Sequence, residues 1–171
     1  MAKLVPQNHP ALHTIAEEVP SEEISSPKIQ KIIKDMKMVL HNCPRGVAIA
    51  APQIGIPLRI FVVHDSTADN KDEDVRIPDM VAVNPKIIRT SKKTDEMEEG
   101  CLSIPHRYGK TIRSTNVTLR AYDENGKEYE RGSGGLLAHI FQHEIDHLDG
   151  ILYTDHAHET WETDDFYEPT K

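Results

Sequence analysis

The sequence has no long apolar run, few aromatic residues and no concentration of positive charge. No window approaches the roughly 20 apolar residues that a membrane-spanning helix needs, and the first ten residues, MAKLVPQNHP, contain no apolar segment after the lysine. We therefore expect a cytoplasmic protein that does not bind membranes. Lysine and arginine number 20 against 28 acidic residues, for a formal charge of -8, and no basic stripe is present. Direct binding of nucleic acid is not expected.

Cysteine is also scarce, because only Cys43 and Cys101 occur in 171 residues. Two cysteines do not make a disulfide scaffold, and in a domain of this size without an export signal we expect both thiols to be reduced. The length suffices for one domain with its own core. We place that domain at residues 1–153. Residues 154–171 are separated as a short acidic C-terminal tail, since residues 155–171 hold six acidic residues against one lysine, a net charge of -5.

The spacing of apolar residues predicts two helices. Ser26 followed by Pro27 is typical of a helix start, and apolar residues then recur every three or four positions as far as Leu40. A second helix is predicted over residues 136–148. Because this helix is apolar on more than one side, we expect it to be buried.

Short apolar stretches between the two helices predict strands. These lie at residues 59–64, 81–83, 87–88, 117–122 and 127–129. The last two strands are joined by an Asn-Gly turn, which favours a hairpin. The polar residues 65–79 predict a solvated loop. Together the elements predict an α+β fold, with short antiparallel sheets packed around the buried second helix.

The second predicted helix carries the sequence HEIDH, from His143 to His147. Residues four apart lie on one face of a helix, so both imidazoles can reach one metal ion, and Glu144 can hold a water molecule beside it. This pattern is typical of metal-assisted hydrolysis. A helix with two ordinary surface histidines would have the same sequence.

A catalytic metal site of this kind needs a third protein ligand. His139 is eight residues from His147, about 12 Å along a straight helix, and cannot bind the same ion. Cys101 is the better candidate, because Gly100 before it permits close approach of the backbone and a metal ion keeps a thiol deprotonated. A cysteine considered alone is more often a small buried apolar residue, and we interpret Cys43 in that way.

Three segments resemble motifs of one known family, the peptide deformylases, in the family's order. They are GVAIAAPQ at residues 46–53, EGCLS at 99–103 and QHEIDHLDG at 142–150. The second and third match at every fixed position, and the flanking stretches between residues 9 and 150 are similar as well. In the first segment, Ala48 stands where the family usually has a second glycine.

The resemblance implies a hydrolase that removes the formyl group from N-formylmethionine at the start of newly made polypeptides. Cys101, His143 and His147 would hold one divalent cation. Ferrous iron is the ion expected in the cell, and the family also tolerates zinc, nickel or cobalt. Glu144 would accept a proton from the attacking water. The Gln53 side chain and the Leu102 backbone N–H would stabilise the oxyanion.

The resemblance also implies how the substrate binds. Its backbone would lie as an additional strand, and an apolar pocket would take the methionine side chain. The substrate-binding residues are then Gly46, Val47, Gly100, Leu136 and His139. For His139, a partly buried histidine bonded to backbone is the preferred interpretation over any catalytic role. Glu99, Arg113 and Asp146 could form an ion network behind the metal, or Arg113 could be an ordinary surface residue of a strand.

The partners implied are formyl-Met nascent peptides, and hence transient proximity to the ribosome. Many relatives dock there through a basic C-terminal helix, whereas the acidic tail of this chain should be repelled by ribosomal RNA. We therefore expect that removing residues 159–171 leaves the turnover of formyl-Met-Ala-Ser-type peptides largely intact.

Two other functions fit parts of the sequence. A zincin-type metalloprotease would share the HEIDH segment, but such enzymes take their third ligand downstream, whereas Cys101 lies upstream. A metal-binding structural protein would enclose its ion with four protein ligands, and the sequence offers no convincing fourth.

Overall fold

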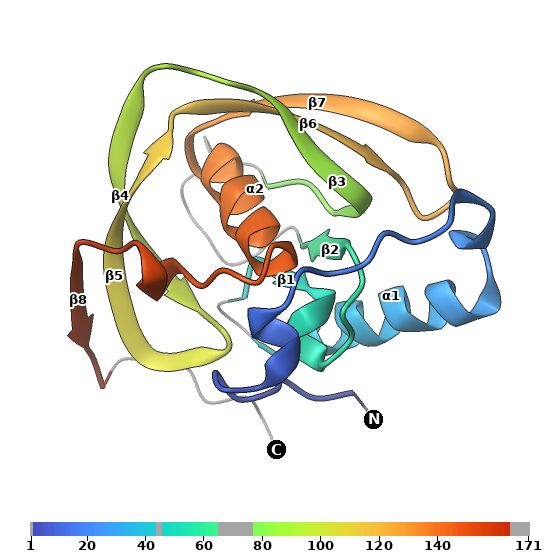
Figure 1. Ribbon diagram of the computed structural model, residues 1–171, viewed down its shortest axis with the longest axis horizontal. Helices are drawn as coiled ribbons and strands as arrows, with labels where there is room; N and C mark the ends of the chain where they lie inside the picture. Colours follow the sequence, from blue (N-terminus) through green and yellow to red (C-terminus); the bar gives the residue numbers. More distant parts are fainter. Residues whose placement is uncertain (1, 44–45, 65–76, 165–171) are drawn as a thin grey trace.

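The computed structural model describes residues 2–43, 46–64 and 77–164. Its helices and strands, in chain order, are α1 (Pro27–His41), β1 (Ala48–Ala50), β2 (Ile60–Val63), β3 (Met80–Thr90), β4 (Thr94–Cys101), β5 (Ile104–Ser114), β6 (Asn116–Tyr122), β7 (Glu128–Gly134), α2 (Gly135–Leu148) and β8 (Glu159–Glu162). The described residues also contain short 3-10 turns: η1 (Pro10–His13), η2 (Ser21–Glu23), η3 (Ala51–Ile54) and η5 (Tyr153–Asp155). The predicted α+β class is confirmed, and α2 runs between the sheets (Figure 1).

A five-stranded antiparallel sheet in the order β1-β2-β3-β6-β7 forms the larger layer. Successive side chains of a strand point to opposite faces. Accordingly Ile60 and Val62 of β2 pack in the cluster that contains α1, whereas Phe61 and Val63 pack in the cluster that contains α2. A helix covers each face at β2, and this is why the strand reads as a continuous apolar run.

Helix α1 begins and packs as the sequence predicts. The Ser26 hydroxyl accepts a hydrogen bond from the Ile29 N–H at 3.4 Å, which satisfies one of the donors at the helix start. The apolar positions spaced every three or four residues are all buried: Ile29, Ile32, Ile33, Met36, Val39 and Leu40. The predicted buried second helix is also found, as α2, where Phe141 and Leu148 are fully buried.

A three-stranded antiparallel sheet in the order β4-β5-β8 forms the second layer. The sequence analysis did not predict any of these strands. The segment TDEMEEGC of β4 is acidic and has no apolar alternation, so its conformation depends on the pairing with β5. Residues 159–162, placed in the tail by the sequence analysis, form β8 and are paired with β5 between Arg107 and Lys110.

Other boundaries differ in detail from the prediction. The stretches 81–83 and 87–88 belong to one strand, β3, which is irregular between Val83 and Lys86. Most of the predicted loop at 65–79 lies outside the described residues, which resume at residue 77 with a buried Ile77. Among the described residues, neither helix has the length and apolar character needed to cross a membrane.

Candidate active site and metal centre

Helix α2 directs the HEIDH segment toward the interior. His147 and Glu144 are 1% and 3% exposed, and the His143 and His147 rings lie 4.8 Å apart at 82°. Two imidazoles four residues apart on one helix therefore face the same buried space. The alternative of two ordinary surface histidines is wrong for this helix.

Cys101, the last residue of β4, meets these histidines from the other layer. Its Sγ atom lies 3.2 Å from His147 Nε2, and one ligand atom from each of Cys101, His143 and His147 falls within 4.8 Å of the others. A thiolate with two imidazoles is a typical open site for a catalytic cation, with a position left for water. Both cysteines are free thiols, and Cys43 is a buried residue whose thiol pKa is raised by burial.

The electrostatics of the cluster favour a cation. Burial opposes a charge on His143, yet its pKa is held well above the usual value by hydrogen bonds to Cys101 and Glu99. Burial, together with His143, depresses the pKa of His147 well below its usual value, so this ring is neutral and available as a ligand. The Cys101–His143–His147 set therefore fits a divalent cation by donor type, geometry and charge.

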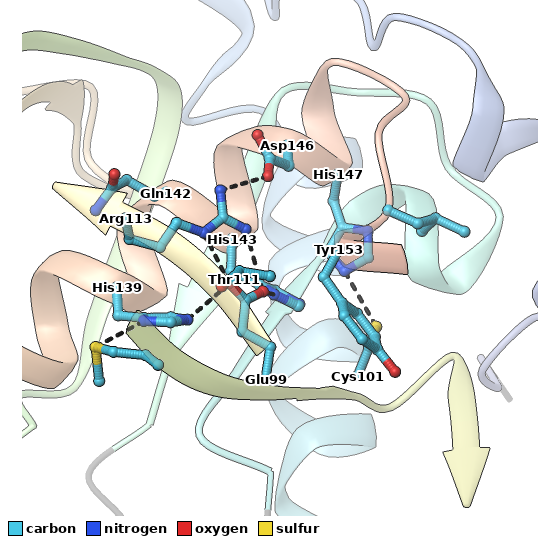
Figure 2. A network of polar contacts seen from close by, with 12 residues as sticks. Glu99, Cys101, Thr111, Arg113, His139, Gln142, His143, Asp146, His147 and Tyr153 are labelled. Carbon is cyan, nitrogen blue, oxygen red and sulfur yellow. Dashed lines mark hydrogen bonds and ion pairs between the residues drawn. The ribbon is translucent and has the colours of Figure 1, made fainter. Parts of the chain in front are cut away.

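Glu99 orients His143 from behind. Its carboxylate lies 2.6 Å from His143 Nδ1, which leaves Nε2 to face the cluster. Arg113 donates to the same carboxylate through Nε at 2.7 Å and Nη2 at 3.1 Å, and through Nη1 to Asp146 at 2.7 Å. Figure 2 shows this network, in which Thr111 also donates to Glu99. The predicted ion network is confirmed; the sequence analysis missed Thr111, which no local pattern marks.

The hydrogen bonds decide the charge of Glu99. Burial alone would raise its pKa, but contacts from His139, His143 and Arg113 hold the pKa well below the usual value. Glu99 is therefore an anion in contact with His143, one of the three residues that could hold a metal ion. Ligand histidines commonly have a carboxylate partner of this kind, which fixes the tautomer and the ring orientation.

Glu144 lies in a different environment. It is 3% exposed, and its Oε2 atom finds no hydrogen-bond partner among the described residues. Burial raises the pKa of this carboxyl to about 7. A carboxylate with a pKa near neutrality and one unpartnered oxygen can accept a proton from a water molecule in the cleft.

Gln53 approaches the cluster from η3. Its Oε1 accepts a hydrogen bond from the Ala50 N–H at 2.8 Å, so Nε2 faces the site, 3.4 Å from both Cys101 Sγ and Ser103 Oγ. Gln53 is 2% exposed. A solvated loop amide, the ordinary alternative for such a residue, is therefore wrong here.

A cleft between the two layers gathers these residues. It is lined by every residue that the sequence analysis assigned to the site except His147, which is buried beneath it. Tyr108 and Glu98 also line the cleft, and the sequence analysis did not select either one. His139 is in the wall, but its partners are side chains: Nδ1 lies 2.9 Å from Met97 Sδ and Nε2 lies 2.8 Å from Glu99.

Comparisons with known proteins agree with one another. The family model described as Polypeptide deformylase matches residues 1–162. The chain is 41% identical to "Peptide deformylase 1A, chloroplastic" of Solanum lycopersicum over 91% of this chain, but it spans only 59% of that relative's length. A crystal structure of a peptide deformylase from Legionella pneumophila has a TM-score of 0.79 at 38% identity, covering 91% of this chain and 85% of the other. A Met-Ala-Ser-bound peptide deformylase from Acinetobacter baumannii has a TM-score of 0.81 at 31% identity, covering 90% and 96%.

Proposed function

The chain belongs to the polypeptide deformylase family, and from that premise we propose that it hydrolyses the formyl group from N-formylmethionine at the N-terminus of newly made polypeptides. The observation that carries the proposal is the convergence of Cys101, His143 and His147 in one cluster at the base of the cleft, with the unpartnered Oε2 atom of Glu144 in the cleft wall. The Acinetobacter baumannii relative was solved with Met-Ala-Ser, a peptide that begins with the methionine such a reaction would leave.

Cys101, His143 and His147 would hold one divalent cation. Such a cation supplies a Lewis acid that makes water a nucleophile near neutral pH. We propose ferrous iron as the ion used in the cell. The same donor set accommodates zinc, nickel or cobalt, because one thiolate and two imidazoles suit all of these ions and availability decides among them.

Glu144 would move the proton in this reaction. It accepts a proton as water adds to the formyl carbon, and then delivers it to the methionine nitrogen as the carbon–nitrogen bond breaks. The products are formate and a free N-terminal amine. A buried carboxylate with a pKa of about 7 suits both transfers, since it is neither too weak a base nor too weak an acid at neutral pH.

The oxyanion formed during attack needs donors that are already in place. We propose Gln53 Nε2 and the Leu102 backbone N–H for this role. The hydrogen bond from Ala50 to Gln53 Oε1 fixes the orientation of the amide, so that its donor end faces the cleft. Removing one such donor should raise the barrier by about 3 kcal/mol.

The two sheets each present an edge strand to the cleft. β1 is the edge of the larger sheet and β4 is the edge of the smaller one, and residues 46–48 and 98–101 line the same cleft. An extended peptide could add between these edges by main-chain hydrogen bonds, which tolerate any sequence. We propose Gly46, Val47 and Gly100 as the backbone partners, with Leu136 and His139 in the wall of the methionine pocket.

A formate-release assay tests the function. Purified protein with bound Fe²⁺, Co²⁺ or Ni²⁺ should release formate from formyl-Met-Ala-Ser, and should leave the peptide bonds of acetyl-Met-Ala-Ser intact. Cleavage of an internal bond would favour the metalloprotease alternative. A metal that is bound tightly, with no hydrolysis of either peptide, would favour the structural alternative.

The location of the protein in the cell and its partners follow from the same proposal. Formyl-Met chains emerge from the ribosome, so we propose transient proximity to it, in the cytoplasm, without direct contact to nucleic acid or membrane. The charge of -8 supports the absence of nucleic-acid contact, because phosphate binding requires clustered cations.

A further inference from the structure

Three residues form one row across the smaller sheet. In the strand register, Gly100 of β4 lies opposite Tyr108 of β5, and Tyr108 lies opposite Trp161 of β8. The Tyr108 and Trp161 rings are stacked, with centroids 6.4 Å apart and planes inclined by 19°. This is the offset geometry that aromatic pairs prefer.

The Tyr108 ring leans from this row over the edge strand. A Cβ atom at Gly100 would lie 2.7 Å from Tyr108 Cε1, closer than non-bonded carbon atoms approach, and 3.1 Å from Cδ1. The ring therefore occupies the space that a side chain at residue 100 would fill. Because Gly100 has no side chain, the ring can lie against the backbone of β4 at this position, and Tyr108 and Gly100 both line the cleft.

The position of the Tyr108 ring relative to the group formed by Cys101, His143 and His147 determines what the ring can contact. Cys101, one of the three proposed metal ligands, directly follows Gly100 in β4. A peptide lying along this edge with its formyl group at the cluster advances about 3.3 Å per residue, so the residues after methionine pass the Tyr108 ring. Its flat apolar face suits the backbone and side chain of a peptide of variable sequence.

We propose that Tyr108 contacts the peptide that follows formyl-methionine, and that Trp161 of the C-terminal strand is a positioning residue that holds the Tyr108 ring over Gly100. This inference rests on the proposed function. It assigns the strand at residues 159–162 a part in substrate binding, and it differs from the expectation that removing residues 159–171 leaves the turnover of formyl-Met-Ala-Ser-type peptides largely intact.

Steady-state kinetics test the positioning role. For formyl-Met-Ala-Ser, Trp161→Ala should raise KM by about two- to tenfold, the range expected from the loss of one aromatic stack, with kcat and metal content unchanged. Trp161→Phe, which keeps an aromatic ring at this position, should have a KM close to that of the wild type. The rise in KM caused by Trp161→Ala should be smaller for formyl-Met amide, because this substrate has no residues after methionine. Thr160→Ala, at the neighbouring exposed position of β8, is the matched control and should behave as wild type.

The outcomes are distinguishable. An unchanged KM in Trp161→Ala, or an equal loss of kcat on both substrates, overturns the inference; the second result would indicate a general structural defect. Absence of formate release from the wild-type protein overturns the proposed function instead. Thermal unfolding of each variant shows whether β8 has been lost as a whole.

Trp161 is the single tryptophan of the chain, so its fluorescence gives a readout that does not need turnover. Titration with the product peptide Met-Ala-Ser should change the Trp161 emission in the wild-type protein, because the peptide contacts the ring stacked on it. The change should be absent in Tyr108→Ala. Calorimetric binding of Met-Ala-Ser without any change of emission, or no binding at all, overturns the inference.

Discussion

Replacing Glu99 with glutamine should weaken metal binding although Glu99 is not itself one of the proposed metal ligands. The Glu99 carboxylate accepts from Arg113, Thr111 and the Nδ1 side of His143. A glutamine amide has one acceptor oxygen and one donor nitrogen. If its oxygen stays with Arg113, its NH₂ group faces His143 Nδ1 and favours the tautomer that carries hydrogen on Nε2. That tautomer cannot bind a cation through Nε2.

The size of the effect follows from these contacts. Loss of a carboxylate partner behind a ligand histidine typically weakens metal binding by about 10- to 100-fold. The variant also leaves Arg113 with only Asp146 as an ion-pair partner in a buried setting. Breaking a buried pair costs about 3 to 5 kcal/mol, and we expect the lower figure because Asp146 remains. For a chain of this length the melting temperature should fall by about 6 to 12 °C.

Competition with a chelator measures the metal affinity, and urea unfolding of the apo protein measures the free energy of unfolding. Glu98→Gln is the control, since Glu98 is the exposed neighbour on β4. Because the pKa of Glu99 lies below its value in the unfolded chain, its stabilisation is complete above about pH 5 and is lost as the pH falls. The stability difference between wild type and variant should shrink accordingly. Unchanged metal affinity in Glu99→Gln would refute the tautomer argument.

Three further predictions concern single residues. Glu144→Gln should keep its metal but lower kcat by about 10²- to 10⁴-fold, as measured by formate release and metal analysis; near-normal turnover would exclude the proton transfer. Cys101→Ser should weaken Co²⁺ binding and remove the thiolate charge-transfer band, and an unchanged spectrum would exclude this ligand. Phe141→Ala should lower the free energy of unfolding by about 3 to 5 kcal/mol, because Phe141 is fully buried and packs 5.9 Å from Phe61; a loss below about 1 kcal/mol in urea unfolding would contradict this.

Local sequence was sufficient for the helices and for half of the site. The start of α1 at Pro27 follows from the Ser26 cap, and its buried face follows from apolar residues at every third or fourth position. Both are local signals, because hydrogen bonds within a helix join residues four apart. The same geometry places His143, Glu144 and His147 together on α2 whatever the rest of the chain does. The need for a third metal ligand added Cys101 as a candidate, the family motifs added Gln53 and Leu102, and all three line the cleft.

The strands around Cys101 could not be predicted in this way. β4 has the composition of a solvated loop, and its conformation comes from hydrogen bonds to β5. The pairing of Glu159–Glu162 with β5 joins segments about 50 residues apart. The sequence pattern of neither segment indicates which strand it pairs with. The sequence analysis therefore separated as a tail a stretch that completes a sheet.

What the sequence determined by itself is the pair of histidines and the glutamate on one helix, since helical spacing is a local property. Tertiary structure alone decided that Cys101 Sγ lies 3.2 Å from His147, that Glu99 supports His143, and that Tyr108 stacks on Trp161. Each of these contacts depends on strand register and on the docking of two layers. Register is fixed by hydrogen bonds and side-chain packing between segments distant in the chain, so it becomes visible only when those segments are brought together.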